Sequence, residues 1–320
     1  MSDSLTGPYE GNERNPILTS RHLSYDNWVN STGHADLVEL EDGRWYMVAL
    51  GIRGDEERRS NMGRETHLIE VEWEREPYWW KEKKYLWPVA APSTGRVERT
   101  SPLPFTDSQH NPSLTLRDDF EQSELGLAWT FRRAPEADAY SLNSRPGFLR
   151  LYSQSTTPAA RGRVAQLGIK QTESDFLFTA RTHFESETRN SEAGVTLFQK
   201  DDHYLNALVK RQENGYELNI TLANRGAPAV LISKAVPDYS GVIEWQLESS
   251  GKHYEVRYRF TPESEWLLLH AMPSTSYSAN TTRAHTSAFT LRAMEPRLQT
   301  TWTLTGRTTE PNQGNRTPFI

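Results

Sequence analysis

The sequence alternates apolar and polar residues along most of its length, and this alternation constrains the fold more than any other feature. The segments ADLVEL, RWYMVALGI and ETHLIEVEWE, residues 35–40, 44–52 and 65–74, have the pattern of strands, and the third alternates apolar with polar residues. Gly, Asn, Asp, Ser or Pro bound such segments, as they bound β-strands. The pair Asp42-Gly43 between the first two segments predicts a hairpin. The sequence therefore predicts an all-β protein.

Residues 91–112, APSTGRVERTSPLPFTDSQHNP, have no sustained period and are rich in Pro, Ser and Thr. Such a stretch is typical of a connection between domains. We therefore predict a first domain over 1–92, a linker over 93–112, a second domain over 113–310 and a disordered tail over 311–320.

The second domain repeats short strand patterns separated by turn residues, which favours a β-sandwich. The pairs Asn214-Gly215 and Ser250-Gly251 mark two of its expected hairpins.

The amino-acid composition excludes several classes of binding partner and of catalytic chemistry. The 320 residues carry a net charge of −6, from 36 basic and 42 acidic side chains, which gives no footprint for nucleic acid or an anionic membrane. The absence of cysteine excludes thiolate catalysis and Cys-based zinc sites. The first residues, MSDSLTGPYEGNERNP, lack the pattern of a signal peptide, and no apolar run is long enough for a membrane helix, so the expected location is cytoplasmic.

Aromatic residues form 11% of the chain, and five of them cluster near the end of the first domain. These rings can stack on sugars or pack in a core, and core packing is the favoured interpretation. They are Tyr78, Trp79, Trp80, Tyr85 and Trp87.

Three segments in their order and spacing, NPILTSRHL, TGHADLVELEDGRWYMVALGIR and NMGRETHLIEVEWE, resemble glycoside hydrolase family 43. The resemblance is to its two-domain β-xylosidases and α-L-arabinofuranosidases, and LRDDFEQSELGLAWTFRRAP resembles the start of their C-terminal domain. It implies about the last two blades of a five-bladed β-propeller, followed by a jelly-roll sandwich of the concanavalin A type.

The family resemblance implies a glycosidase that hydrolyses O-glycosyl bonds in hemicellulose with inversion. Inverting enzymes use two carboxyl groups far enough apart for water to attack between them. In the family these groups and a third, modulating carboxylate precede the stretch matched by SDSLTGPYE, so this chain is expected to lack them and to be inactive alone. The alternative is a non-catalytic carbohydrate-binding or structural β-sandwich. Xylo- or arabino-oligosaccharides are the expected partners, and the oligomeric state stays open.

Two site residues follow from the resemblance. His34, in TGHAD, matches a histidine near the propeller funnel that helps organise the site and, in many members, a central metal ion. Arg64, in MGRET, matches an arginine that donates hydrogen bonds to the sugar, a role that suits its planar fork. Taken alone, His34 is a turn histidine and Arg64 a salt-bridged surface residue. No cofactor is required, although the complete family fold can hold Ca²⁺.

The C-terminal sequence departs from the family. Residues 301–306 read TWTLTG, where the family usually has an acidic alternation such as Asp-Phe-Asp. A one-base shift of a codon string for Tyr-Val-Asp-Phe-Asp-Trp yields this same TWTLTG, which suggests a frameshift near residues 284–289. In that case the sandwich is expected to lack its last strand and to expose an unpaired edge.

Overall fold

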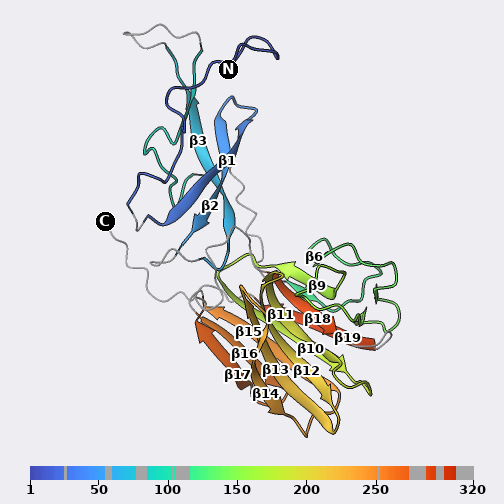
Figure 1. The fold of residues 1–320 in the computed structure, drawn as a ribbon. Coiled ribbons are helices and arrows are strands. Elements are labelled where there is room, and N and C mark those ends of the chain that lie inside the picture. The colour runs from blue at the N-terminus through green and yellow to red at the C-terminus, as the bar shows by residue number, and fades with distance from the viewer. Residues whose placement is uncertain are drawn as a thin grey trace. The chain divides into compact units, whose positions relative to one another are not determined.

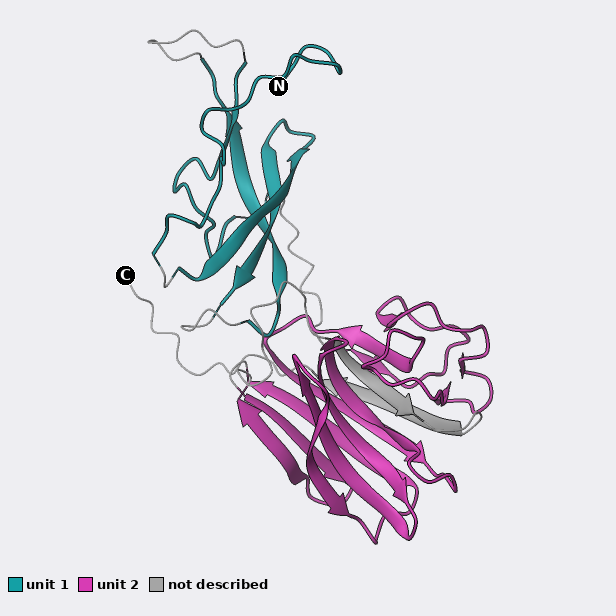
Figure 2. Cartoon of the chain, viewed as in Figure 1, with its two compact units in different colours: residues 1–110, 280–282 teal, residues 111–279, 283–320 magenta. Residues whose placement is uncertain are grey.

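The computed structural model describes residues 1–24, 27–54, 60–76, 85–102, 104, 116–250 and 253–273, together with the backbone of 286–292 and 299–307. These residues contain strands and turns and no helix, which confirms the all-β prediction. The chain divides into two compact units (Figure 2): unit 1 is 1–110 with 280–282, and unit 2 is 111–279 with 283–320. The rings of Tyr78, Trp79 and Trp80 lie outside the described residues.

Unit 1 contains one four-stranded antiparallel sheet (Figure 1). Its strands are β1 (Val29–Glu39), β2 (Trp45–Arg53), β3 (Arg64–Trp73) and β4 (Pro88–Ala90). Each strand pairs with the next one in sequence, as in a single propeller blade. We expected about two blades, and the described residues form one.

The predicted hairpin at Asp42-Gly43 joins β1 to β2. The Gly43 amide donates to the Leu40 carbonyl at 2.9 Å, and the Leu40 amide donates to the Arg44 carbonyl at 2.9 Å. Gly43 has φ of 82°, a conformation that costs glycine little because it has no Cβ. The turn chemistry is therefore confirmed, with Gly43 as the residue that needs positive φ.

The core of unit 1 extends into the predicted linker. Val97 is only 5% exposed, and its carbonyl accepts a hydrogen bond from Trp28 Nε1 at 3.3 Å. It packs with six other buried residues, which are Val29, Met47, Ala49, Ile69, Val71 and Ala90. Apolar burial thus continues past the last strand of unit 1, into a segment without any periodicity.

Unit 2 is a sandwich of two antiparallel sheets. The larger has the order β17 (Leu267–Pro273), β16 (His253–Arg259), β15 (Val242–Ser250), β10 (Asp175–Phe184), β19 (Gln299–Arg307), β8 (Leu149–Tyr152) and β7 (Tyr140–Ser141), with β5 (Arg117–Asp118) also paired to β19. The smaller has the order β14 (Ala229–Ala235), β13 (Gly215–Asn224), β12 (His203–Gln212), β11 (Glu192–Lys200), β18 (Thr286–Arg292), β9 (Ala165–Lys170) and β6 (Trp129–Phe131). The predicted sandwich is confirmed.

Period-two alternation builds the core of the sandwich. On β10, Phe176, Phe178 and Ala180 are buried, and the residues between them are more exposed. Trp245 on the neighbouring β15 is fully buried in the same cluster. A hairpin forms near Asn214-Gly215, but its turn lies one residue earlier than predicted, at Glu213-Asn214, since Gln212 pairs with Gly215.

The C-terminal strand β19 lies inside its sheet, paired with β10 on one side and with β8 on the other. The expectation of an unpaired edge left by a missing last strand is therefore wrong. Threonine and tryptophan favour extended backbone. The residues 299–307 can thus form a central strand without the acidic alternation of the family.

Candidate functional site

His34 lies within strand β1, where the sequence predicted a turn. The β1–β2 register shifts twice around it, between Asn30 and Gly33 and again between Gly33 and Asp36. His34 has φ of 50°, and Ser31 has φ of 54°. Positive φ is uncommon for residues with a side chain and costs about 1–2 kcal/mol. The bulged strand thus holds an exposed histidine in a strained conformation.

Arg64 is the first residue of β3, and its side chain is exposed. It pairs across the sheet with Ile52 of β2, which in turn pairs with Asn30 of β1. The adjacent Glu65 accepts two hydrogen bonds from Arg53, at 2.8 and 3.2 Å.

His34 and Arg64 are brought onto one sheet, on β1 and β3 with β2 between them. Leu50, the partner of Gly33, is two residues from Ile52, the partner of Arg64. Both side chains therefore come from the same end of the blade. Asp36 is exposed on β1 and pairs with Val48.

His67 on β3 was missed by the sequence reasoning. Burial lowers the pKa of its imidazole, and its Nε2 has no hydrogen-bond partner among the described residues. Its ring packs edge to face on Trp28, with centroids 5.6 Å apart. A Cβ on Gly51 would approach this ring within 2.8 Å, so Gly51 makes room for it. The available signal was the alternation of ETHLIEVEWE, which places His67 on the face of Ile69 and Val71.

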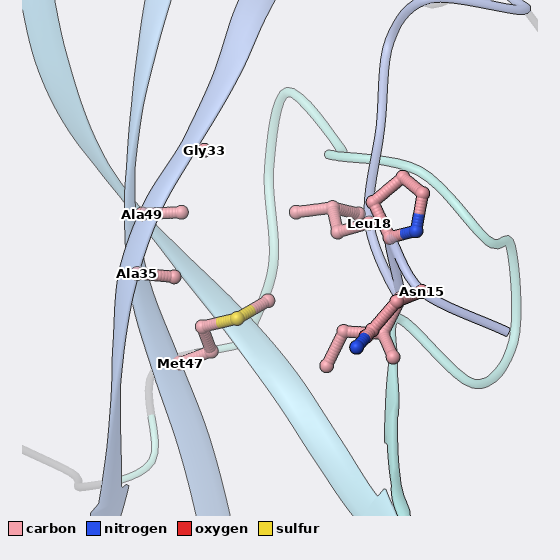
Figure 3. Close-up of a pocket in the computed structure, with 8 residues that line it drawn as sticks. Asn15, Leu18, Gly33, Ala35, Met47 and Ala49 are labelled. Carbon is pink, nitrogen blue, oxygen red and sulfur yellow. The ribbon is translucent and has the colours of Figure 1, made fainter. Parts of the chain in front are cut away.

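A pocket of about 460 Å³ adjoins the bulged part of β1 (Figure 3). One wall is formed by Gly33 and Ala35 of β1 with Met47 and Ala49 of β2, and the other by residues 15–18. Figure 3 shows the Met47 side chain reaching into the space between these walls. The lining is mainly apolar and does not include His34, so the pocket does not supply the polar groups that a sugar requires.

The direction in which a carboxyl pKa is shifted indicates whether that group suits a general acid. The pKa shifts downward for Asp42 through a hydrogen bond from Arg44, and for Asp202 through a hydrogen bond from His203. The pKa of Glu217 is also lowered, by hydrogen bonds from Ser233, Gln212 and Asn219 that outweigh its burial. A general acid needs the opposite shift.

No group of three or more His, Cys, Asp or Glu gathers around a metal-sized space in the described part of the chain. His34 is thus not part of such a group among the described residues. Asp118 accepts hydrogen bonds from Trp129 Nε1 at 2.7 Å and from the Phe120 amide at 2.8 Å. The described residues include no helix long and apolar enough to cross a membrane.

Comparison with known protein families identifies the family of this chain. Residues 117–290 match the family described as "Beta xylosidase C-terminal Concanavalin A-like domain", and residues 1–77 match "Glycosyl hydrolases family 43". This chain belongs to glycoside hydrolase family 43. It contains part of the catalytic propeller domain, followed by the concanavalin A-like sandwich of the family's xylosidases.

Curated family 43 relatives share about a third of their aligned residues with this chain. It is 33% identical to the non-reducing end alpha-L-arabinofuranosidase BoGH43B of Bacteroides ovatus over 237 residues, which cover 74% of this chain and 40% of that protein. It is 31% identical to a xylosidase/arabinosidase of Butyrivibrio fibrisolvens over 246 residues, 76% of this chain and 45% of the relative. The chain thus spans less than half the length of these two relatives.

Solved structures of the family match the fold closely. The Bacteroides ovatus Xyloglucan PUL GH43B structure superposes with a TM-score of 0.83 at 25% identity, over 96% of this chain and 60% of the other. A xylan beta-1,4-xylosidase from Bacillus halodurans C-125 matches with a TM-score of 0.81 at 20% identity, over 95% and 59% of the two chains. At 20% identity, the similarity to the Bacillus halodurans structure supports only the fold.

Proposed function

We propose that this chain is part of an inverting glycosidase that removes xylosyl or arabinofuranosyl units from hemicellulose. The observation that carries the proposal is the identity of 31–33% to an α-L-arabinofuranosidase and a xylosidase/arabinosidase. The bulged β1 and the start of β3 provide the chain's share of the sugar site.

Arg64 binds the sugar in this proposal. An exposed guanidinium at the start of β3 presents several N–H donors in one plane, and paired hydroxyl oxygens can accept two of them at once. His34 is the second substrate-binding residue. Its position on the same end of the sheet and its strained backbone are typical of residues retained for binding.

Hydrolysis by the 320 residues alone is not expected. Inversion requires a general acid with a raised pKa and a general base across the scissile bond. The shifted carboxyl groups in the described residues, Asp42, Asp202 and Glu217, all have lowered pKa values. We therefore propose that this chain binds sugar without cleaving it, and that any ion such as Ca²⁺ belongs to the complete family fold.

Release of nitrophenol from nitrophenyl β-xyloside and nitrophenyl α-L-arabinofuranoside tests inactivity, and calorimetric titration with xylobiose and arabinobiose tests binding. We expect no turnover above the blank and weak binding that falls at least tenfold in Arg64→Ala. Arg96→Ala, which removes another exposed arginine of unit 1, is the matched control and should bind normally. Turnover by the unmodified chain that disappears in Arg64→Ala would overturn the proposal of inactivity.

A second function is favoured by the sandwich itself, which has two paired sheets and one continuous core. Such a unit can act as a non-catalytic carbohydrate-binding or structural domain. Binding of xylo-oligosaccharide by the full chain that survives both His34→Ala and Arg64→Ala would favour this alternative over the site in unit 1.

A further inference from the structure

Three arginines surround His183 on the outer face of the larger sheet of unit 2. His183 and Arg181 are two residues apart on β10, and the neighbours of each along the strand are buried, so both side chains lie on the face away from the core. Arg145 contacts the imidazole, with its Nη1 3.3 Å from His183 Nδ1. Together with Arg150, these residues form what we call the arginine cluster.

Arg150 reaches the same face from β8. It lies between Leu149 and Leu151, which are both fully buried, so its side chain lies on the outer face. In the register Arg150 pairs with position 301 of β19, which pairs in turn with His183. Adjacent strands are about 4.8 Å apart, so the Cα atoms of Arg150 and His183 are about 10 Å apart. The long side chains of Arg150 and Arg181 can therefore approach one anion from two sides.

The described residues do not neutralise the charge of the arginine cluster. Neither Arg150 nor Arg181 forms a hydrogen bond or an ion pair within them. Burial, followed by two arginines of the cluster, lowers the pKa of the His183 imidazole, and no carboxylate of the described residues offsets this shift. Glu244 of β15 lies across from Arg181, but Arg259 Nε donates to it at 2.6 Å. The cluster thus carries positive charge that is available to a ligand.

Ion pairs border the arginine cluster and limit it to one small anionic group. Toward β16, Arg259 binds Glu244, and Arg257 binds Glu248 at 2.5 Å. The whole chain has a net charge of −6, so the positive charge is a local feature. A nucleic acid or an anionic membrane needs an extended basic surface, whereas a single carboxylate can accept paired hydrogen bonds from guanidinium groups. The cluster therefore favours an isolated carboxylate.

Hydroxyl groups border the cluster on the side of β7 and β8. Ser141 of β7 lies directly opposite Arg150, and its Oγ accepts a hydrogen bond from Ser144 Oγ at 2.8 Å. The Ser144 Oγ also lies 3.2 Å from Tyr152 Oη. Ser144 is exposed, and Tyr152 is partly exposed. Hydroxyl groups of a sugar can both donate to and accept from such side chains. These surroundings suit an acidic sugar better than a bare inorganic anion.

We propose that the arginine cluster binds the carboxylate of a uronate side group on a hemicellulose chain. The proposal rests on the proposed function for the class of polysaccharide. Arg150 and Arg181 donate to the carboxylate oxygens, and Ser144 and Tyr152 bind the hydroxyl groups of the same sugar. Unit 2 thereby recognises the acidic side groups of a polysaccharide, separately from the neutral sugars bound in unit 1.

Calorimetric titration of the full 320-residue chain with two ligands tests the proposal. The ligands are xylotriose with one glucuronate substituent and neutral xylotriose. At low salt we expect the acidic ligand to bind at least fivefold more tightly, and 1 M salt should abolish the difference. The preference should also disappear in Arg181→Gln, and in Thr303→Asp, which places a carboxylate of the chain itself opposite Arg181. Arg161→Gln, at another exposed arginine of unit 2, is the matched control and should keep the preference.

The NMR resonances of the His183 imidazole report where the acidic ligand binds. We expect them to shift and the pKa of the imidazole to rise, because a bound carboxylate favours its charged form. Equal affinity for the two ligands, or a preference that survives both Arg181→Gln and Thr303→Asp, overturns the proposal. Inorganic phosphate that binds as tightly as the acidic ligand also overturns it, since the cluster is then a general anion site.

The two ligands separate this proposal from the proposed function. Binding of neutral xylotriose that does not depend on Arg64 contradicts the sugar site in unit 1. A preference for the acidic ligand that depends on Arg181 supports the arginine cluster in either case.

Discussion

Arg181 of β10 lies directly opposite Thr303 of β19 in the antiparallel register. Its other neighbour across the sheet, Glu244 of β15, is held by Arg259, whose Nε donates to it at 2.6 Å. Within the described residues Arg181 has no ion-pair partner. Arg181 thus lies at a central position of the larger sheet without a paired carboxylate among the described residues.

We expect Thr303→Asp to stabilise unit 2, because an opposite charge directly across from Arg181 adds about 0.2–1 kcal/mol. Urea denaturation measures the change in the free energy of unfolding. Thr303→Asn, similar in size and uncharged, should give no such gain, and the gain from aspartate should shrink in 1 M salt. Equal effects of the two substitutions would contradict the ion pair.

The register between β10 and β19 also relates to the hypothesis of a frameshift before residue 301. Positions 302, 304 and 306 lie opposite the buried Thr182, Ala180 and Phe178. In the shifted frame these positions carry Val, Phe and Trp, and position 303 carries the missing aspartate. We expect sequencing of the gene and of its transcript to reveal a one-base difference upstream of residue 301. An uninterrupted frame in both would refute the frameshift.

His183 should make stability depend on pH. Burial, together with Arg145 and Arg181, lowers the pKa of this imidazole from 6.5 to about 4. The unfolded chain then binds the proton more readily than the folded one. The stability due to neutral His183 is complete above pH 6.5 and is lost as pH falls toward 4. With allowance for solvent screening, the loss between pH 7.5 and 5 is about 1 kcal/mol.

His183→Gln removes this titration and keeps a polar side chain of similar size. Denaturation of both proteins at the two pH values isolates the contribution, because all other titrating groups are shared. An identical pH dependence in the variant would show that His183 does not titrate in this range.

Gly194 of β11 tolerates no side chain. A Cβ at this position would lie 1.9 Å from the Ala207 carbonyl oxygen and 2.7 Å from the Leu208 Cα, both backbone atoms that cannot turn aside. We expect Gly194→Ala to cost about 3 kcal/mol or more, or to prevent folding. Gly226→Ala, with nothing within 4 Å of the new Cβ, should change stability by less than about 0.5 kcal/mol. Similar melting temperatures for the two variants would contradict the contact.

The variant His34→Gly distinguishes the contribution of His34 to stability from its contribution to ligand binding. Glycine relieves the steric cost of φ at 50°, and it adds conformational freedom to the unfolded chain. These effects nearly cancel, so the free energy of unfolding should change by less than about 1 kcal/mol. Xylobiose binding should nevertheless fall at least fivefold. A large loss of stability with unchanged binding would assign His34 a purely structural role.

Much of the fold was predictable because strands with one buried face carry their pattern in the local sequence. The strand-like segments RWYMVALGI and ETHLIEVEWE identified β2 and β3, and Asp42-Gly43 identified the hairpin between β1 and β2. Site prediction was harder. His34 lies in a bulged strand, because two register shifts against β2 override the turn chemistry of Gly-His-Ala-Asp.

The sequence by itself determined the all-β class, the hairpin at Asp42-Gly43, the sandwich and the resemblance to family 43, because period, turn residues and motifs are local properties of the chain. Only the tertiary structure decided what depends on distant partners. It placed β19 between β10 and β8, buried Val97 beside Trp28, and brought the rings of Trp45 and Trp73 into contact. Such contacts join residues from 28 to about 150 positions apart. The pairing of strands and burial of side chains select them, and no local pattern encodes that choice.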